Sequence, residues 1–323
     1  MDPQKYLADL ERKPDVLAAL ADHLEAEDPW GVLPMASRFV FLGMGSSAYA
    51  AGVAAARLRS HGIHAVAELA SSDLLPSADG HTVVVAVSAG GGSRETRAAV
   101  EHYVGRCPVV LLTNTPGGAL AQALEGGVHE LVDMRAGVEE GGVACRSFQH
   151  TLALLLTLEP RVARVDLDVP SLVRRAATAS ADLLARRDEW LPDVRRLLVG
   201  PHGTHVVAPA RRLSSAQQSA LMLREGPRIQ SYACETGDWS HVDVYLTTTT
   251  DYRMLLLAGS PWEDELLRWT AERGSTVVAV GADVAGVALS LRYEGDEDDD
   301  VRLLTETLVA ELLAADLWLH PDA

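Results

Sequence analysis

The sequence predicts an α/β protein whose mainly parallel sheets are covered by helices on both faces. Two observations support this fold class. Short apolar segments alternate with helical segments along the whole chain, and glycine- or serine-rich loops follow several of the apolar segments. Strands that are apolar throughout, rather than at every second position, are typical of parallel sheets buried on both sides. The 323 residues suit two such blocks.

The first block extends over residues 31–160 and follows a helical lead-in at residues 1–30. Pro14 is expected to kink or split the lead-in helix, because proline removes a backbone donor. Strands are then expected at 38–43, 64–68, 82–87, 108–112 and 129–132. Helices are expected between or after them, at 46–61, 93–104, 117–124 and 146–157. This alternation predicts a Rossmann-like three-layer sandwich.

The second block, residues 161–323, repeats this organisation without a short internal period. It begins with connecting helices at about 161–195. Strands or extended pieces are expected at 205–208, 231–233, 243–247, 254–257, 275–280 and 288–292, and helices at 213–225, 262–273 and 301–318. We therefore predict two α/β domains in tandem.

Composition limits the classes of partner. The 28 basic and 45 acidic residues give a net charge of −17, which argues against nucleic acid and anionic membranes. No apolar stretch approaches the roughly 20 residues of a membrane span. The charged first 30 residues and three isolated cysteines favour a cytoplasmic protein. An anionic small ligand stays possible, because helix N-terminal amides bind anions without lysine.

Two acidic or histidine-rich features have a metal-binding alternative. The acidic run 294–300 is interpreted as a solvated loop ahead of a helix N-terminus, in preference to a metal site. His202 and His205 flank Gly203, but their spacing is weak evidence for a metal pair. We expect neither a metal nor another cofactor.

Two loops carry the functional signal. The segment Gly43-Met-Gly45-Ser46-Ser47-Ala48 formally matches a dinucleotide fingerprint, with Glu68 at the distance expected for a ribose ligand, or it is simply a tight strand-to-helix turn. The segment Ser88-Ala89-Gly90-Gly-Gly-Ser93 also connects a predicted strand to a helix. Its glycines allow close approach of an anion, which the serine hydroxyls and the helix dipole would favour. A dinucleotide domain leaves this second loop unexplained, although a flexible loop with helix-capping serines is an alternative.

These segments resemble the SIS (sugar isomerase) family, most specifically the isomerase domains of glucosamine-6-phosphate synthases. Gly45, Ser46 and Ser47 resemble that family's C-G-T-S turn, and Ser88 to Ser93 resemble its S-Q-S-G-E-T loop. The segment 139–148, with Gly142, Val143 and Arg146, resembles its P-E-I-G-V-A-S-T-K-A-F pocket segment. The resemblance runs from about residue 38 to 318. It implies tandem SIS domains in which Ser46, Ser47, Ser88 and Ser93 bind phosphate, although Ala89 and Gly90 replace a glutamine and a serine.

The resemblance also implies a catalytic pair. Leu221-Met-Leu-Arg-Glu225 is similar to the family's L-K-L-K-E helix end, and Gly237-Asp-Trp-Ser-His241 to its G-E-L-K-H. Glu225 would then move a proton between C1 and C2, and His241 would open the ring, tasks that suit a carboxylate and an imidazole. A surface glutamate and a capping or core histidine are the alternative. Met222 replaces a family lysine and the family's C-terminal tail lysine is expected to be absent, so Arg224 or Arg146 is the candidate charge stabiliser.

The leading prediction is therefore a cofactor-independent sugar-phosphate or amino-sugar-phosphate isomerase, or a deaminase/isomerase, that acts through an enediol or enolamine. The family places the corresponding histidine in a neighbouring subunit's site, which implies a homodimer. A non-catalytic sugar-phosphate sensor is the first alternative, and a nicotinamide-dependent oxidoreductase is the less favoured second one. The sequence leaves open which sugar binds, whether it is phosphorylated or aminated, and the direction of reaction.

Overall fold

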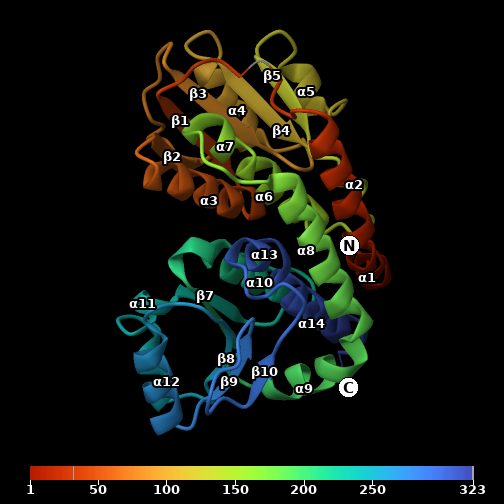
Figure 1. Ribbon diagram of the computed structural model, residues 1–323, viewed down its shortest axis with the longest axis vertical. Helices are drawn as coiled ribbons and strands as arrows, with labels where there is room; N and C mark the ends of the chain where they lie inside the picture. Colours follow the sequence, from red (N-terminus) through yellow and green to blue (C-terminus); the bar gives the residue numbers. More distant parts are fainter. Residues whose placement is uncertain (32, 322–323) are drawn as a thin grey trace. The chain divides into compact units, whose positions relative to one another are not determined.

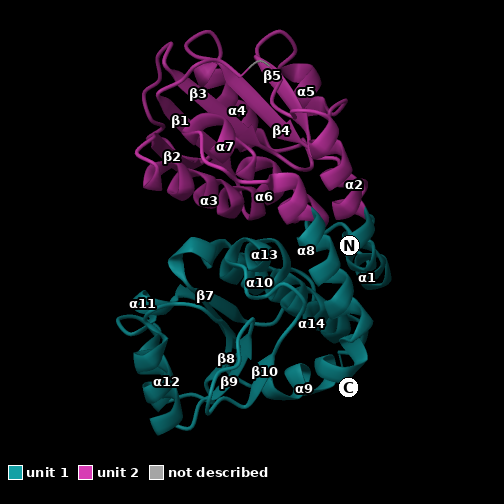
Figure 2. Ribbon diagram, viewed as in Figure 1, with its two compact units in different colours: residues 1–15, 140–145, 174–323 teal, residues 16–139, 146–173 magenta. Residues whose placement is uncertain are grey.

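The computed structural model describes residues 1–31 and 33–321, which form two compact units with one sheet each (Figure 1, Figure 2). Unit 1 comprises residues 1–15, 140–145 and 174–323, and unit 2 comprises residues 16–139 and 146–173. The prediction of an α/β fold with two parallel, helix-flanked sheets is confirmed. Both units are discontinuous in sequence, and the domain bounds 31–160 and 161–323 stay a prediction.

Unit 2 contains a five-stranded sheet in the order β2-β1-β3-β4-β5, in which every neighbouring pair is parallel. Its central strand β3 is buried at every position, as an apolar run predicts. The elements of this unit are α2 (Lys13–Ala26, from Val16 on), β1 (Arg38–Gly43), α3 (Ser46–Ser60), β2 (His64–Leu69), β3 (Thr82–Val87), α4 (Arg94–Tyr103), β4 (Val109–Thr113), α5 (Ala119–Ala123), β5 (Glu130–Asp133), α6 (Arg146–Leu156) and α7 (Leu158–Ala163).

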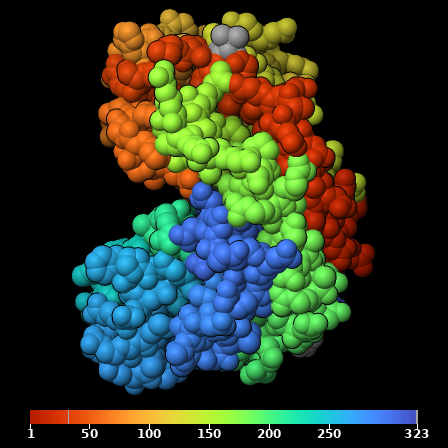
Figure 3. Space-filling view, viewed as in Figure 1, coloured from red at the N-terminus to blue at the C-terminus, as the bar shows by residue number. Residues whose placement is uncertain are grey.

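Helices cover both faces of this sheet. α4 and α5 bury Tyr103 and Leu120 against one face, which includes Val84 of β3. α3 packs on β1 and on α6 and α7 at the other. In the space-filling view, red residues of the first part of this unit adjoin the lime-green residues that follow α6 (Figure 3). Trp30 Nε1 donates to Thr157 Oγ1 over 2.6 Å. This contact joins the beginning and the end of the unit's chain.

Unit 1 contains the second sheet, in the order β10-β9-β8-β6-β7, again with every neighbouring pair parallel. Its elements are α1 (Pro3–Glu11), α8 (Val169–Ala185, from Arg174 on), α9 (Arg187–Leu198), β6 (Thr204–Ala208), the 3-10 helix η1 (Ala210–Arg212), α10 (Leu213–Glu225), β7 (Ser231–Glu235), α11 (Thr236–Trp239), the 3-10 helix η2 (Asp243–Thr248), β8 (Arg253–Leu257), α12 (Glu263–Glu272), β9 (Thr276–Val280), β10 (Leu289–Leu291), α13 (Asp299–Thr305) and α14 (Thr307–Leu319).

The helices of unit 1 divide between the two faces of its sheet. On one face Trp239 of α11 and Leu266 of α12 pack with Val207 and Leu256. The other face is covered by α9, α10 and α14, of which α10 and α14 lie side by side (Figure 1). α10 and α11, which position the catalytic candidates described below, therefore pack on opposite faces of the sheet.

The segment 140–145 belongs to unit 1 through its contacts with the N-terminal helix. Gly141 N donates to the buried carboxylate of Asp9 over 2.8 Å, and a Cβ at Gly141 would lie 2.5 Å from Tyr6 Cα. Only glycine permits so close a backbone approach. α1 in turn packs on α14, near which Lys13 and Glu311 form a fully buried ion pair.

The two sheets share one topology. Numbered within its own unit, each has the strand order 2-1-3-4-5 with all strands parallel. In such a sheet the connections leave the first and third strands in opposite directions, and ligands bind beyond the carboxyl ends of these strands, at the topological switch point. The switch point lies between β1 and β3 in unit 2 and between β6 and β8 in unit 1.

The structure corrects three details of the secondary-structure prediction. The expected strand at 243–247 is the 3-10 helix η2, in which Val244 and Thr247, three residues apart, are the buried positions. The expected closing helix at 301–318 is divided into α13 and α14 at Glu306. The lead-in helix does split near Pro14, but the break falls at Arg12, because proline is tolerated in the first turn of α2. Among the described helices, none is both long and apolar enough to cross a bilayer.

Candidate functional site

The switch point of unit 2 is formed by the two loops that the sequence singled out. β1 ends at Gly43 and β3 at Val87, and the strands are parallel neighbours, so their loops emerge at the same edge. A Cβ at Gly43 would lie 2.7 Å from the Ser47 backbone, which explains why the turn into α3 requires glycine there. Gly45 adopts φ 52 and ψ −127, a conformation restricted to glycine.

The second loop, residues 88–93, contacts Thr113 and Thr115 on one side and borders open space at Gly90. Thr113 Oγ1 donates to Ser88 O over 2.8 Å, and a Cβ at Gly91 would collide with Thr115 Oγ1 at 2.2 Å. In contrast, a Cβ at Gly90 or at Gly45 would meet no atom within 4 Å. The two loops therefore border open space at the carboxyl edge of the sheet.

Hydroxyls and helix N-termini border this space. Ser46 and Ser47 begin the 15-residue helix α3, and Ser88 is 6% exposed. Ser93 is the N-cap of α4, where its Oγ accepts from Thr96 N at 3.0 Å. These donors and the two helix dipoles favour an anion.

Glu95 places a carboxylate on the same helix start. Its Oε2 accepts a hydrogen bond from Ser93 Oγ over 3.1 Å. The backbone N–H of Glu95 itself, followed by the Ser93 hydroxyl, lowers the pKa of Glu95 below its ordinary value. An anion at this loop would therefore encounter a fixed negative charge beside Ser93.

The corresponding switch point of unit 1 is filled with side chains. A Cβ at Gly259, in the loop after β8, would lie 2.7 Å from Arg302 Nη1, 3.0 Å from Arg212 Nη2 and 3.4 Å from Arg211 Nη2. Glu263 Oε1 accepts from the backbone N–H groups of Gly259 and Ser260, the latter over 2.7 Å. The Glu263 carboxylate thus accepts from backbone amides that could otherwise bind an anion at this switch point.

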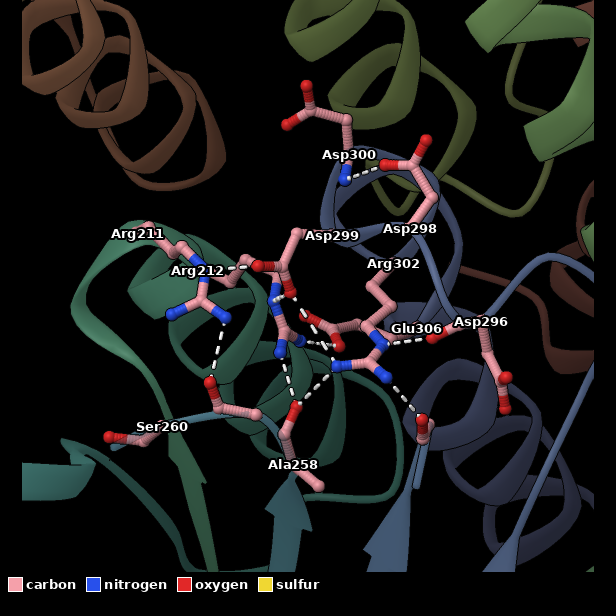
Figure 4. A network of polar contacts seen from close by, with 12 residues as sticks. Arg211, Arg212, Ala258, Ser260, Asp296, Asp298, Asp299, Asp300, Arg302 and Glu306 are labelled. Carbon is pink, nitrogen blue, oxygen red and sulfur yellow. Dashed lines mark hydrogen bonds and ion pairs between the residues drawn. The ribbon is translucent and has the colours of Figure 1, made fainter. Parts of the chain in front are cut away.

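The arginines belong to one polar network (Figure 4). Arg212 donates to Glu306 and to Ala258 O, and Arg302 donates to Ala258 O over 3.1 Å. Arg302 Nη2 also donates to Gly281 O over 2.6 Å, and the guanidinium of Arg211 bonds to the carboxylate of Asp299. Side chains of unit 1 therefore fill its switch point, whereas the loops at the switch point of unit 2 border open space.

Part of the acidic run 294–300 enters this network. Asp298 caps α13 by accepting from Asp300 N over 2.8 Å, which confirms a loop ahead of a helix N-terminus. The expectation of a solvated run is wrong for Asp296, which is 1% exposed and accepts hydrogen bonds from Arg292. Burial alone would raise the pKa of Asp299, but the hydrogen bond from Arg211 and the nearby arginine charges outweigh it and lower that pKa.

The two histidines near β6 have separate partners. His202 Nδ1 accepts from Asp251 N over 3.1 Å, whereas His205 Nδ1 lies 3.2 Å from Asp243 Oδ2. Among the described residues, no group of three or more metal-ligating side chains converges. The contact of His205 with Asp243 is one that the sequence did not indicate, since His205 was considered only together with His202.

Glu225 and His241 both lie in unit 1 but on opposite faces of its sheet. Glu225 is the half-buried last residue of α10, and Arg224 beside it is exposed. His241 is exposed and follows α11, which packs on the other face. Within one unit the structure does not bring this predicted pair together.

The pocket segment 139–148 divides between the units. Gly142, with φ 75, and the buried Val143 belong to unit 1, where Gln218 Nε2 of α10 donates to Ala144 O over 2.8 Å. Arg146 begins α6 in unit 2, is fully buried and donates to Val138 O. Gln218, seven residues before Glu225 on the same helix, is a further contact of this segment that the sequence reading missed.

Comparison with known proteins assigns the first of these sheets. The profile of the SIS domain matches residues 33–158, which include β1 to β5 and both loops of the open switch point. Residues 33–158 are therefore similar to SIS domains. The sheet of unit 1 lies outside this match, so the second SIS domain of the predicted tandem remains a proposal.

Most of the chain is similar to a curated relative and to several solved structures. The chain is 26% identical over 275 residues to a glutamine–fructose-6-phosphate aminotransferase (isomerizing) of Aeropyrum pernix, covering 77% of this chain and 44% of that protein. The chain thus spans less than half the length of this relative.

Three solved structures share the fold. The C-terminal domain of glucosamine-fructose-6-phosphate aminotransferase from Francisella tularensis is 15% identical, with a TM-score of 0.83 over 98% of this chain and 95% of that one. The tagatose-6-phosphate ketose/aldose isomerase from Escherichia coli is 18% identical, with a TM-score of 0.79 over 98% and 93%. The glucosamine-6-phosphate deaminase from Thermotoga maritima is 16% identical, with a TM-score of 0.72 over 98% and 95%.

Proposed function

We propose that this chain binds a phosphorylated sugar or amino sugar at the open switch point of unit 2 and catalyses its aldose–ketose isomerisation or its deamination with isomerisation. The observation that carries the proposal is the loop pair of the SIS domain, where serine hydroxyls and two helix N-termini border open space around Gly45 and Gly90. The phosphate would bind to Ser46, Ser47, Ser88 and Ser93, with backbone atoms of Gly45, Ala89 and Gly90 alongside.

The proposed chemistry needs only proton transfers. A base removes the proton from the carbon next to the carbonyl while the carbonyl oxygen gains a proton, which gives an enediol. The base then returns its proton to the former carbonyl carbon while the other enediol hydroxyl loses its proton, so no electrons leave the substrate. Glu225 is the proposed base and His241 the group that moves the ring-oxygen proton. In the deamination, an enolamine forms instead, water is consumed and ammonia leaves.

The segment 140–145 supplies two further proposed substrate contacts. Gly142 and Val143 would contact the substrate, and Gln218 would hold the segment against the helix that ends at Glu225. Arg224 is exposed beside Glu225 and is the proposed stabiliser of negative charge on the intermediate. Arg146 is the second candidate for that role, although it is fully buried and already donates to Val138 O.

A homodimer would complete this site. Because Glu225 and His241 lie on opposite faces of the sheet of unit 1, the His241 that serves one Glu225 is proposed to come from a second copy. Exposed apolar side chains flank His241, namely Val242, Tyr245 and Leu246, and such clusters are typical of interfaces. Sedimentation of the wild type and Tyr245→Asp tests this, with dissociation expected for the variant.

Proton exchange in deuterium oxide tests the catalytic proposal. Fructose 6-phosphate, tagatose 6-phosphate and glucosamine 6-phosphate are incubated with the protein, and loss of the C1 or C2 proton signal is followed by NMR. Exchange with the wild type that falls at least 100-fold in Glu225→Gln supports the proposal. Glu272→Gln, at the exposed end of α12, is the matched control and should exchange at the wild-type rate.

A non-catalytic sensor is the second candidate. Gly90 stands where the related loop has serine, and Met222, which is buried against Gln218, stands where the related helix has lysine. Both changes favour binding without turnover. A sugar phosphate that raises the melting temperature but exchanges no proton would select the sensor.

A further inference from the structure

His205 and Asp243 form a polar pair that bridges 38 residues. His205, the second residue of β6, is 3% exposed, and its Nδ1 lies 3.2 Å from Asp243 Oδ2. Its ring stacks between two tyrosines, with centroids 4.1 Å from Tyr252 and 5.2 Å from Tyr232. The histidine is therefore fixed on both ring faces and presents one ring nitrogen to Asp243.

A second contact fixes the other side of the same segment. Trp239 is fully buried, and its Nε1 donates to Tyr252 Oη over 2.8 Å. Tyr252 is the residue on which His205 stacks. Trp239, Tyr252, His205 and Asp243 thus form a closed chain of contacts around the short backbone segment from residue 239 to 243.

His241 lies at the centre of that segment, two residues from Trp239 and two from Asp243. Its own side chain is exposed, as are those of Val242 and Tyr245. An exposed segment with few buried contacts opens readily unless specific contacts fix it. The closed chain of contacts supplies such fixation on both sides of His241.

Further hydrogen bonds fix the backbone on either side of the segment 239–243. The Glu235 carboxylate caps α11 by accepting from Gly237 N and Asp238 N at 2.8 and 2.9 Å. Arg273 Nη1 donates to Val244 O and Thr247 Oγ1 at 2.7 and 2.8 Å. These contacts hold the two ends of the region, and Asp243 is the side chain that ties its middle to the sheet.

We infer that His205 and Asp243 are positioning residues, which hold the backbone of His241 in place for the reaction. The inference rests on the proposed role of His241 in catalysis. Neither residue touches substrate in this account. They act through the segment that carries His241, and loss of their bond would lower turnover while leaving phosphate binding at the loops of unit 2 unchanged.

Three variants separate the bond from the packing. His205→Phe keeps an aromatic ring between the tyrosines but loses the bond to Asp243. Asp243→Ala removes the acceptor, whereas Asp243→Asn keeps an acceptor oxygen for His205. Glu265→Gln removes an exposed ion pair with Arg268 on α12 and is the control.

Hydrogen–deuterium exchange of the full-length protein tests the positioning directly. Amides of residues 236–248 should exchange at least 10-fold faster in Asp243→Ala and His205→Phe than in the wild type, and within 3-fold of the wild type in Asp243→Asn and the control. Thermal unfolding confirms that each variant is folded. Unchanged exchange in both Asp243→Ala and His205→Phe would overturn the inference. If His205→Phe does not fold, Asp243→Ala compared with Asp243→Asn still decides it.

Kinetics connect the positioning to the reaction. With the hexose phosphate that exchanges best, kcat should fall at least 10-fold in Asp243→Ala with KM within 2-fold, and Asp243→Asn should recover most of it. Faster amide exchange with unchanged kcat would overturn the catalytic half of the inference. His241→Ala is measured alongside. If His241→Ala keeps wild-type turnover, the proposed role of His241 is wrong. Amide exchange then decides by itself whether His205 and Asp243 fix the segment 239–243.

Discussion

Arg212 and Glu306 form an ion pair whose side chains are 1% and 0% exposed, and the pair joins the start of α10 to the start of α14. It lies at the switch point of unit 1. The same position in unit 2 borders open space at Gly45 and Gly90. The two sheets therefore have the same strand order but differ in what occupies the switch point, and this difference supports the proposed site in unit 2.

Breaking the Arg212–Glu306 pair should destabilise the protein strongly. Arg212→Met leaves Glu306 as an unpaired buried carboxylate, and the loss of one partner of a buried pair costs about 3–5 kcal/mol. Urea unfolding measures this cost. The double variant Arg212→Met/Glu306→Leu should lose less than half of the sum of the two single losses, because no unpaired charge remains. A single loss below about 1 kcal/mol would contradict a buried pair.

Removal of the Glu95 charge should strengthen anion binding. Like charges repel, so Glu95→Gln should bind fructose 6-phosphate severalfold more tightly than the wild type does. Titration calorimetry measures the affinity. Glu101→Gln, which removes an exposed carboxylate paired with Arg97 on the same helix, is the control and should match the wild type. An unchanged or lower affinity for Glu95→Gln would place the anion away from Ser93.

Introducing a hydroxyl at Gly90 should also strengthen phosphate binding. A Cβ there meets no atom within 4 Å, so the fold should accept a side chain. Gly90→Ser adds a donor to a charged acceptor, a bond worth about 1.5 kcal/mol, and affinity for fructose 6-phosphate should rise about tenfold. Gly90→Ala adds the carbon without the hydroxyl and should bind as the wild type does. Equal affinities for the two variants would contradict a phosphate next to residue 90.

The stability of unit 1 should decrease in acid. Arginine contacts outweigh burial and lower the pKa values of Asp298 and Asp299 below their ordinary value of 3.8. A carboxylate with a depressed folded-state pKa stabilises the fold above its unfolded value, and that stabilisation is lost as pH falls through the folded value. The free energy of unfolding should therefore fall from about pH 4 downward. Asp299→Asn should show a shallower fall, and identical slopes would contradict the assignment.

The local elements of the fold were predictable from particular residues. Val83 to Val87 are apolar at every position, which identified a central parallel strand. The glycines at 43 and 45 marked a strand-to-helix turn because only glycine fits there. The run 243–247 was misread as a strand, since its aromatic and β-branched residues have strand propensity. Its conformation is decided by burial of Val244 and Thr247 and by partners distant in sequence.

The long-range polar pairs were not predictable from one sequence. Arg212 and Glu306 are 94 residues apart, and His205 and Asp243 are 38 apart. No local pattern indicates which of the chain's many arginines and carboxylates will meet. The distinction between an open and a filled switch point depends on these pairs, so the sequence could nominate the loops of unit 2 but could not exclude those of unit 1.

Calorimetric titration of Gly90→Asp and Gly90→Asn with fructose 6-phosphate and inorganic phosphate tests the central claim most directly. The two side chains have nearly the same shape and differ by one negative charge, and both enter the space that a Cβ at Gly90 leaves open. The account predicts one ligand per chain for the wild type, similar affinity for Gly90→Asn, and affinity at least tenfold weaker for Gly90→Asp. Equal affinity for the aspartate and asparagine variants, with both proteins folded, would contradict an anion-binding site at the open switch point of unit 2.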